Sequence, residues 1–153
     1  MSNHAASGPF KNVHHICIVV PDIAEATDYF ESIGIGPWTD YPSFDEYTDL
    51  SMERSDLESL TFVYCDSTSP QFQLCQPSDA DTSQRKFLDE HGAGVYHIGF
   101  DADDVDAAEQ AGKNLSLSVI SRGRRDDGSG FTYFGTRPQI GVTLEVRKGS
   151  TAH

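Results

Sequence analysis

Two histidines occupy the same step of two similar segments of the chain, and each imidazole can bind a metal ion or carry a proton. HHICIVVPDIAEATDYF begins at His14 and YHIGFDADDVDAAEQAG begins at Tyr96, and the two segments align without a gap. Counted from His15 and from His97, both have Ile at the next position, Asp at the seventh and Ala at the eleventh. Repetition at an offset of 82 residues, about half of the chain, indicates two copies of one structural unit.

A glutamine and a glutamate occupy matching places near the end of each half. In PQFQLCQP, Phe72 and Leu74 alternate with Gln73, and in GVTLEVRKG the apolar residues alternate with Glu145. Alternation with a period of two is typical of a strand that buries one face. Gln73 and Glu145 therefore lie on the face opposite the apolar residues.

The strand that opens each repeat alternates in the same way. Ile16 faces away from His15, and Ile98 faces away from His97. A helix is predicted to follow each strand, with Asp22 as the N-cap of the first helix. Asp104 is the corresponding N-cap in the second copy. The apolar residues of these helices are Ile23, Ala26 and Phe30 in one copy and Val105 and Ala108 in the other. The helices are expected to cover the isoleucine faces, which leaves both histidines on the uncovered side.

Two imidazoles, one amide and one carboxylate suit a borderline divalent ion such as Co, Ni, Mn, Fe or Zn, whereas magnesium is less natural with two imidazoles. A single histidine on a strand is more often simply packed or exposed. Duplication of a core motif would repeat the positions, but it would not require histidine. We therefore take His15, Gln73, His97 and Glu145 as candidate metal ligands.

The remaining segments predict an α+β fold built from two βαβββ modules, which form a curved mixed sheet with a metal and substrate cavity. The first module is expected at residues 13–77 and the second at 95–148, within a single domain spanning 1–153. Residues 78–94 are interpreted as the connector between the modules, helical around Phe87 and Leu88.

Shorter patterns predict the inner strands. Residues 60–65 and 131–135 are expected to form the middle strands, and the segments near residues 50 and 119 are weaker strand candidates. The stretch SRGRRDDGSG at residues 121–130 is predicted to be a loop because of its Gly and Asp content.

Composition excludes several classes of partner. The chain has 153 residues and a formal net charge of −13, which repels nucleic acid and anionic lipid. Cys17, Cys65 and Cys75 are odd in number and lie in apolar runs, as reduced core cysteines do. MSNHAASGPF lacks a secretion signal, and the chain has no run of 18 apolar residues. We expect a cytoplasmic protein with a small-molecule substrate.

The order of these motifs resembles the metal-binding set of the vicinal oxygen chelate superfamily, also called the glyoxalase/bleomycin resistance/dioxygenase superfamily. The motifs are the HI that begins at His15, FQL around Gln73, HIGF from His97 and GVTLE ending at Glu145, and the resemblance spans residues 13–148. Within the superfamily the sequence is most similar to methylmalonyl-CoA epimerase-like members. The resemblance also implies a homodimer.

The resemblance implies a metal-dependent isomerase, epimerase or lyase that stabilises the enolate of a small carbonyl substrate. Glu145 would then be both a metal ligand and the catalytic proton carrier. Three alternatives stay open: a glyoxalase I-like lactoylglutathione lyase, a mononuclear iron dioxygenase, and a ligand-sequestering protein similar to the bleomycin-resistance members. The dioxygenases have no ligand at the position that matches Gln73, and the sequestering proteins lack the metal set.

The chain departs from the epimerase pattern before the strand LTFVYC. Epimerases have a catalytic glutamate just upstream of it, whereas this chain offers Glu53, Asp56 and Glu58 without a clear match. The basic loop at residues 121–130 contains Arg122, Arg124 and Arg125, which could hold a carboxylate or phosphate group or could be neutralised by nearby aspartates.

His14 supplies a test of the assignment of His15, because the two neighbours face opposite sides of one strand. We expect His14→Ala to retain a bound transition metal and His15→Ala to lose it. Metal content after purification without chelator measures the difference, and equal loss in both variants would contradict the predicted strand orientation.

Overall fold

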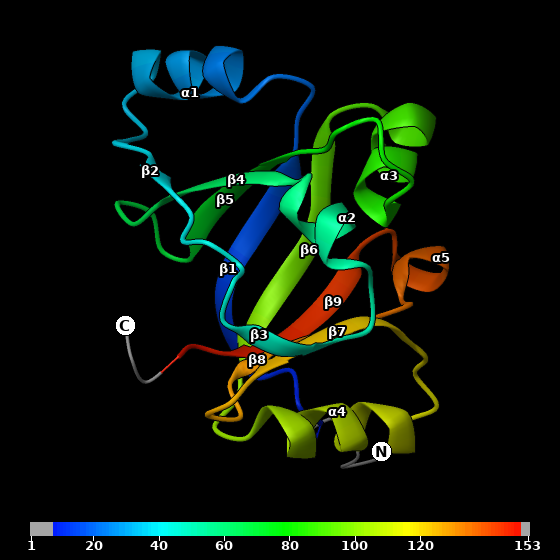
Figure 1. Cartoon of the computed structure of the whole chain (residues 1–153). Helices are drawn as coiled ribbons and strands as arrows, with labels where there is room; N and C mark the ends of the chain where they lie inside the picture. The colour runs from blue at the N-terminus through cyan, green and yellow to red at the C-terminus, as the bar shows by residue number, and fades with distance from the viewer. Residues whose placement is uncertain (1–7, 151–153) are drawn as a thin grey trace. The chain divides into compact units, whose positions relative to one another are not determined.

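The computed structural model describes residues 8–150 and confirms the α+β class, with helices interspersed among the strands of a mixed sheet (Figure 1). Within these residues the strands are β1 Asn12–Val19, β2 Thr39–Asp40, β3 Tyr47–Leu50, β4 Thr61–Cys65, β5 Gln71–Gln76, β6 Gly94–Asp101, β7 Val119–Arg125, β8 Gly130–Phe134 and β9 Thr143–Lys148. The helices are α1 Ile23–Ser32, α2 Arg54–Glu58, α3 Ser83–His91, α4 Val105–Asn114 and α5 Arg137–Ile140. No helix among the described residues is long and apolar enough to cross a membrane.

The described chain divides into two compact units. One contains the residues up to His14, then Asp45–Met52, and then Ile98 onward, and we call it unit 1. The other, unit 2, contains His15–Phe44 and Glu53–His97. Strands β1 and β6 each contribute residues to both units.

Unit 2 is organised around β1 and its parallel neighbour β5. The strand order is β2-β4-β5-β1-β6, and β4 runs antiparallel to both β2 and β5. Helix α1 packs its apolar residues on one side of this sheet, against Ile18, Val63 and Leu74. Its N-terminus is capped by Asp22, whose Oδ1 accepts from the Glu25 amide at 3.0 Å, as the sequence predicts.

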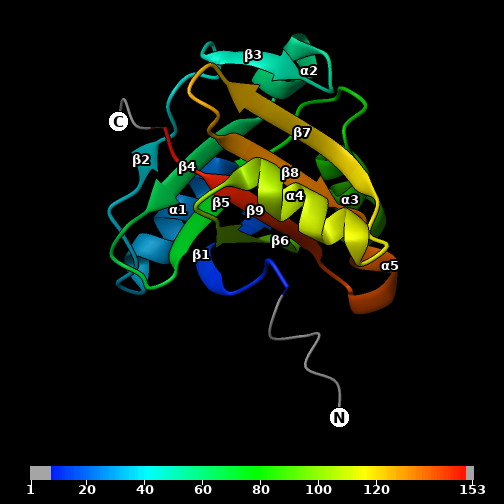
Figure 2. The same cartoon turned by 90° about the horizontal axis from the view of Figure 1, so that it is seen from below.

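Unit 1 repeats this arrangement with the strand order β6-β9-β8-β7-β3. Helix α4 lies across β8 and β9 (Figure 2) and buries Val105 and Ala108 against Phe134 and Val146. Asp104 caps it by accepting from the Ala107 amide at 3.0 Å. In both copies the helix therefore covers the apolar face of its sheet.

The edge strand β3 comes from the first half of the chain but belongs to unit 1. Residues 47–50 pair antiparallel with β7, between residues 123 and 125 of that strand. The three strands that follow α1 in unit 2 are consequently β2, β4 and β5. The predicted module boundaries near residues 77 and 95 stay a prediction.

The predicted loop at residues 121–130 is wrong over its first half. Residues 119–125 form strand β7, and the turn is confined to the residues between β7 and β8. Strand β7 can contain Arg122, Arg124 and Arg125 because each guanidinium group lies next to an acidic side chain. Arg122 donates to Glu109 at 2.8 Å and to Asp49 at 3.1 Å, while Arg125 lies 3.6 Å from Glu46.

Arg124 is the most enclosed of the three arginines, with 5% of its surface exposed. Its guanidinium donates to Asp106 at 2.8 Å, to Glu109 at 3.0 Å and to Thr132 at 3.0 Å, and also to two backbone carbonyl oxygens. Such a buried cation is stable only when its donors are satisfied. Helix α4, which carries Asp106 and Glu109, is thereby fixed to strands β7 and β8.

The ionisation of Glu109 makes the stability of this network depend on pH. Burial raises the pKa of its carboxyl, but hydrogen bonds from Thr132, Arg122 and Lys113 lower it more, from 4.5 to about 2. A depressed pKa means that the stabilisation is fully present above about pH 4.5 and is lost as the pH falls toward 2.

Replacing Glu109 by Gln should reveal this contribution, because the substitution removes the negative charge that Arg122 and the buried Arg124 share and leaves Arg124 with Asp106 alone as a charged partner. We expect Glu109→Gln to lower the free energy of unfolding at pH 7 by about 3 kcal/mol. In urea titrations the difference from the wild type should narrow as the pH falls from 4.5 toward 2. Glu31→Gln, on the exposed side of α1, is the control and should change stability by less than about 0.5 kcal/mol. A difference that is independent of pH would contradict the proposed ionic role.

Candidate metal centre

His15 and His97 come together from the two repeat strands β1 and β6. Their Nε2 atoms are 2.9 Å apart, and the rings are nearly perpendicular, with centroids at 5.0 Å. Both side chains are almost completely buried, at 3% and 1% exposure. Strand alternation explains the orientation of His15, because Ile18, which has the opposite parity on β1, packs on the side that α1 covers.

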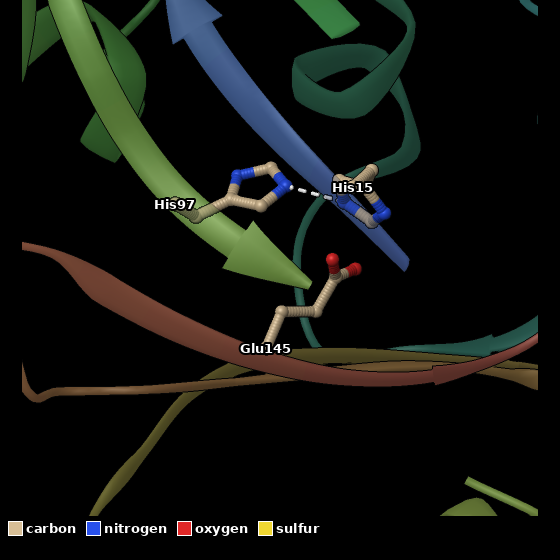
Figure 3. Close-up of side chains that lie close together, drawn as sticks. All are labelled: His15, His97 and Glu145. Carbon is tan, nitrogen blue, oxygen red and sulfur yellow. Dashed lines mark hydrogen bonds between the residues drawn. The ribbon is translucent and has the colours of Figure 1, made fainter. Parts of the chain in front are cut away.

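Glu145 is the third member of the cluster. It lies on β9, where the neighbouring residue Val146 packs against α4, so alternation turns Glu145 to the opposite face. One possible ligand atom from each of His15, His97 and Glu145 lies within 4.8 Å of the other two. Figure 3 shows the three side chains pointing toward one another. Glu145 is buried, with 5% of its surface exposed. The structure thus brings together three of the four predicted ligands.

The geometry of the cluster fits a divalent cation. Two nitrogens bound about 2.1 Å from one ion are about 3.0 Å apart at right angles and about 3.4 Å apart at a tetrahedral angle. The 2.9 Å hydrogen-bond distance between the histidines lies closer to the right-angle value. A buried carboxylate beside two imidazoles supplies negative charge and nitrogen lone pairs in a place with little water. Borderline transition ions favour this donor set.

Gln73, the fourth predicted ligand, lies on β5 on the same face as His15. Parallel pairing places it beside Cys17, two residues beyond His15 on β1, and its side chain is 4% exposed. Its Nε2 donates to Oε1 of Gln71 at 2.9 Å. Its coordination of a metal stays a prediction.

The other candidate residues lie outside the three-residue cluster. His14 is half-buried on β1. Glu53 occupies the N-cap position of α2 without a side-chain capping bond and is exposed, Asp56 is half-buried on that helix, and Glu58 is exposed at its end. Burial raises the pKa of the Cys75 thiol, which disfavours the thiolate that a metal would require.

The arginines of β7 are engaged by acidic side chains of the protein. Arg122 and Arg124 share the Glu109 carboxylate, and Arg125 stacks over the Tyr47 ring at 4.3 Å from its centroid. These contacts favour a structural role for Arg122, Arg124 and Arg125 over a role in substrate binding.

Several residues near the predicted ligands were missed by the sequence analysis. Tyr133 is the register partner of Glu145 across β8 and β9, and Gln71 is the register partner of His15 across β5 and β1. An aromatic cluster lies on the Gln73 face of unit 2, where Tyr64 is the register partner of Gln73. Its half-buried members are Tyr41, Phe44, Phe62 and Tyr64. The alternation of Gln71 with Phe72 indicates that Gln71 lies on the same strand face as Gln73, so Gln71 could have been found from the sequence. The register between strands, which places Tyr133 beside Glu145 and Tyr64 beside Gln73, does not follow from the sequence pattern.

Comparison with known proteins identifies a family and supports the fold. The family model of the Glyoxalase/Bleomycin resistance protein/Dioxygenase superfamily matches residues 14–134. YqjC of Bacillus subtilis, a protein described as uncharacterized, is 24% identical over 134 residues, which are 86% of this chain and 88% of YqjC.

Two solved structures of similar fold are methylmalonyl-CoA epimerases. The enzyme from Mycobacterium tuberculosis has a TM-score of 0.70 and 16% identity, covering 95% of this chain and 93% of its own. A variant of the Streptomyces coelicolor enzyme, in complex with 2-nitronate-propionyl-CoA, has a TM-score of 0.68 and 20% identity, covering 93% and 99%. At these identities the similarity shows the fold alone.

Metal binding should be measurable without any substrate. We expect saturating Co²⁺ or Ni²⁺ to raise the melting temperature, because a ligand present at 100 times its Kd stabilises the folded state by about 2.7 kcal/mol. Differential scanning fluorimetry measures the shift, which should be about 5–10 °C for a domain of this size. A His15→Ala/His97→Ala double variant is the control, and an equal shift in that variant would place the binding elsewhere.

Proposed function

This chain belongs to the Glyoxalase/Bleomycin resistance protein/Dioxygenase superfamily, and we propose that it is a metal-dependent isomerase, epimerase or lyase acting on a small carbonyl substrate. The observation that carries the proposal is the buried convergence of His15, His97 and Glu145. The similarity in fold to methylmalonyl-CoA epimerases supports it.

We propose that His15, Gln73, His97 and Glu145 hold one divalent ion. The first three offer two imidazole nitrogens and an amide oxygen, and Glu145 contributes a carboxylate oxygen. When bound, a divalent ion supplies positive charge beside a carbonyl oxygen and so makes an adjacent C–H bond more acidic.

Glu145 is proposed to move the proton. Among the four side chains, its carboxylate is the one anionic base, since the amide of Gln73 does not accept a proton under these conditions and the imidazole lone pairs of His15 and His97 would be committed to the ion. The C–H bond breaks as the proton passes to a Glu145 oxygen, and the electron pair moves onto the substrate carbonyl. Return of a proton to carbon completes an isomerisation, and return to the opposite face completes an epimerisation.

An epimerase needs a second acid to deliver that proton. Glu53, Asp56 and Glu58 on or next to α2 are the candidates that precede β4 in the chain. Asp56 is half-buried, whereas the two glutamates are exposed. Asp56 is therefore the first of these residues to test, because its side chain is the least exposed of the three.

A second candidate function follows from the donor set itself. Two histidines and one carboxylate also form the facial triad of non-haem Fe(II) oxygenases. Gln73 decides between the two functions, because a fourth protein ligand would occupy a position that the oxygenases keep open. Activity that disappears when oxygen is strictly removed would favour the dioxygenase. Activity that persists would favour the isomerase or lyase.

The sharpest test of the proton transfer is Glu145→Gln, which keeps a similar shape and an oxygen for the metal but removes the base. We expect this variant to fold and to retain a bound ion. Its exchange of the acidic substrate hydrogen for solvent deuterium should fall by about 100-fold or more. NMR of a carbonyl substrate that the wild-type protein turns over, recorded in D₂O, measures the rate.

The control is Glu31→Gln, on the exposed side of α1. It should exchange at a rate close to that of the wild type if Glu145 is the base. Exchange by Glu145→Gln at the wild-type rate would move the search for the base to α2.

A further inference from the structure

Three polar side chains form a continuous line of hydrogen bonds that ends at Gln73. Nε2 of Gln73 donates to Oε1 of Gln71 at 2.9 Å, and Nε2 of Gln71 donates to Oδ1 of Asp66 at 2.7 Å. Asp66 follows β4, while the two glutamines lie on the same face of β5. We call Asp66, Gln71 and Gln73 the amide relay.

The polarity of the relay is set at Asp66. A carboxylate has only acceptor atoms, so the Gln71 group that faces Asp66 must be its NH₂. The carbonyl oxygen of Gln71 then faces Gln73, which must in turn present its own NH₂. One aspartate therefore determines the orientation of two amides, neither of which has an orientation preference of its own.

The remaining oxygen of Gln73 is the atom that a metal ion requires. Amides bind cations through oxygen and not through NH₂, so a reversed Gln73 would be unable to serve as a ligand. Two amides can hydrogen-bond to each other in either direction, so without Asp66 the pair loses its fixed polarity. Gln73 is buried, so its NH₂ group needs a hydrogen-bond acceptor from the protein in place of water.

We propose that Asp66 and Gln71 are positioning residues, which hold the Gln73 amide with its oxygen available to a divalent cation. Strand register supports the arrangement, because Gln71 is the β5 partner of His15 and Gln73 is the next residue on that face. The inference rests on the proposed metal centre. It assigns to Asp66 and Gln71 the role of orienting one proposed ligand, Gln73.

Gln71→Lys tests the relay, because a side chain that only donates would draw the Gln73 oxygen toward itself. We expect the Kd for Co²⁺, measured from its visible absorption, to rise tenfold or more. The introduced ammonium group also adds a positive charge, so the same substitution is made in a Gln73→Ala background. There it should change the Kd by less than about threefold, whereas a purely electrostatic effect would persist.

A charge-neutral rescue supplies the matched control. In Asp66→Asn/Gln71→Glu the new carboxylate can accept from both neighbouring amides, which restores the original orientation of Gln73 without changing net charge. We expect a Kd within about threefold of the wild type. A loss as large as that of Gln71→Lys would overturn the relay.

A metal-free measurement separates this proposal from the proposed function. With chelator present, Gln73→Glu places an acceptor against the Gln71 oxygen and should lower the melting temperature. Adding Asp66→Asn frees Gln71 to turn, so at least half of the loss should be recovered. Additive shifts would overturn the relay. Failure of the wild type to bind Co²⁺ would overturn the metal centre, while this cycle still decides how Gln73 is oriented.

Discussion

Burial of three polar, ionisable side chains in one place is the constraint on which the remaining structure depends. His15, His97 and Glu145 are at most 5% exposed, and isolated groups of this kind are costly to remove from water. A shared cation would compensate that cost by satisfying a carboxylate and two imidazoles together. The scaffold must therefore deliver the side chains to one point while keeping their neighbours apolar. Strand alternation does both, because residues adjacent to the cluster face α1 or α4.

The two copies meet this constraint with different chemistry. The second copy contributes Glu145, which carries charge and can accept a proton, whereas the first contributes Gln73, which does neither. A neutral amide binds a cation in one of its two orientations only, and so it needs partners that a symmetric carboxylate does not need. Asp66 and Gln71 can meet that need in the first copy. On the proposed assignment, the duplicated fold combines a proton carrier, Glu145, with a neutral ligand, Gln73.

Residues whose role is fixed by local pattern were predictable. The strand faces of His15 and Glu145 follow from alternation, and the caps Asp22 and Asp104 follow from residue type. The position of β7 did not follow, because Arg124 is compatible with a strand only when Asp106 and Glu109 reach it from α4. Gln71 was missed for the same reason, because only the register of β1 and β5 places it beside His15. Contacts between distant segments are not determined by either segment alone.

The passage of the chain through unit 1 has a consequence for synthesis on the ribosome. Strand β3 at residues 47–50 pairs with β7, which begins only at Val119, so about seventy residues must follow before its partner exists. A nascent strand with an open edge can pair with another chain. This strand is only four residues long, and its central residues Thr48 and Asp49 are polar and exposed. Shortness and charge therefore protect the nascent protein from aggregation during the interval before β7 emerges.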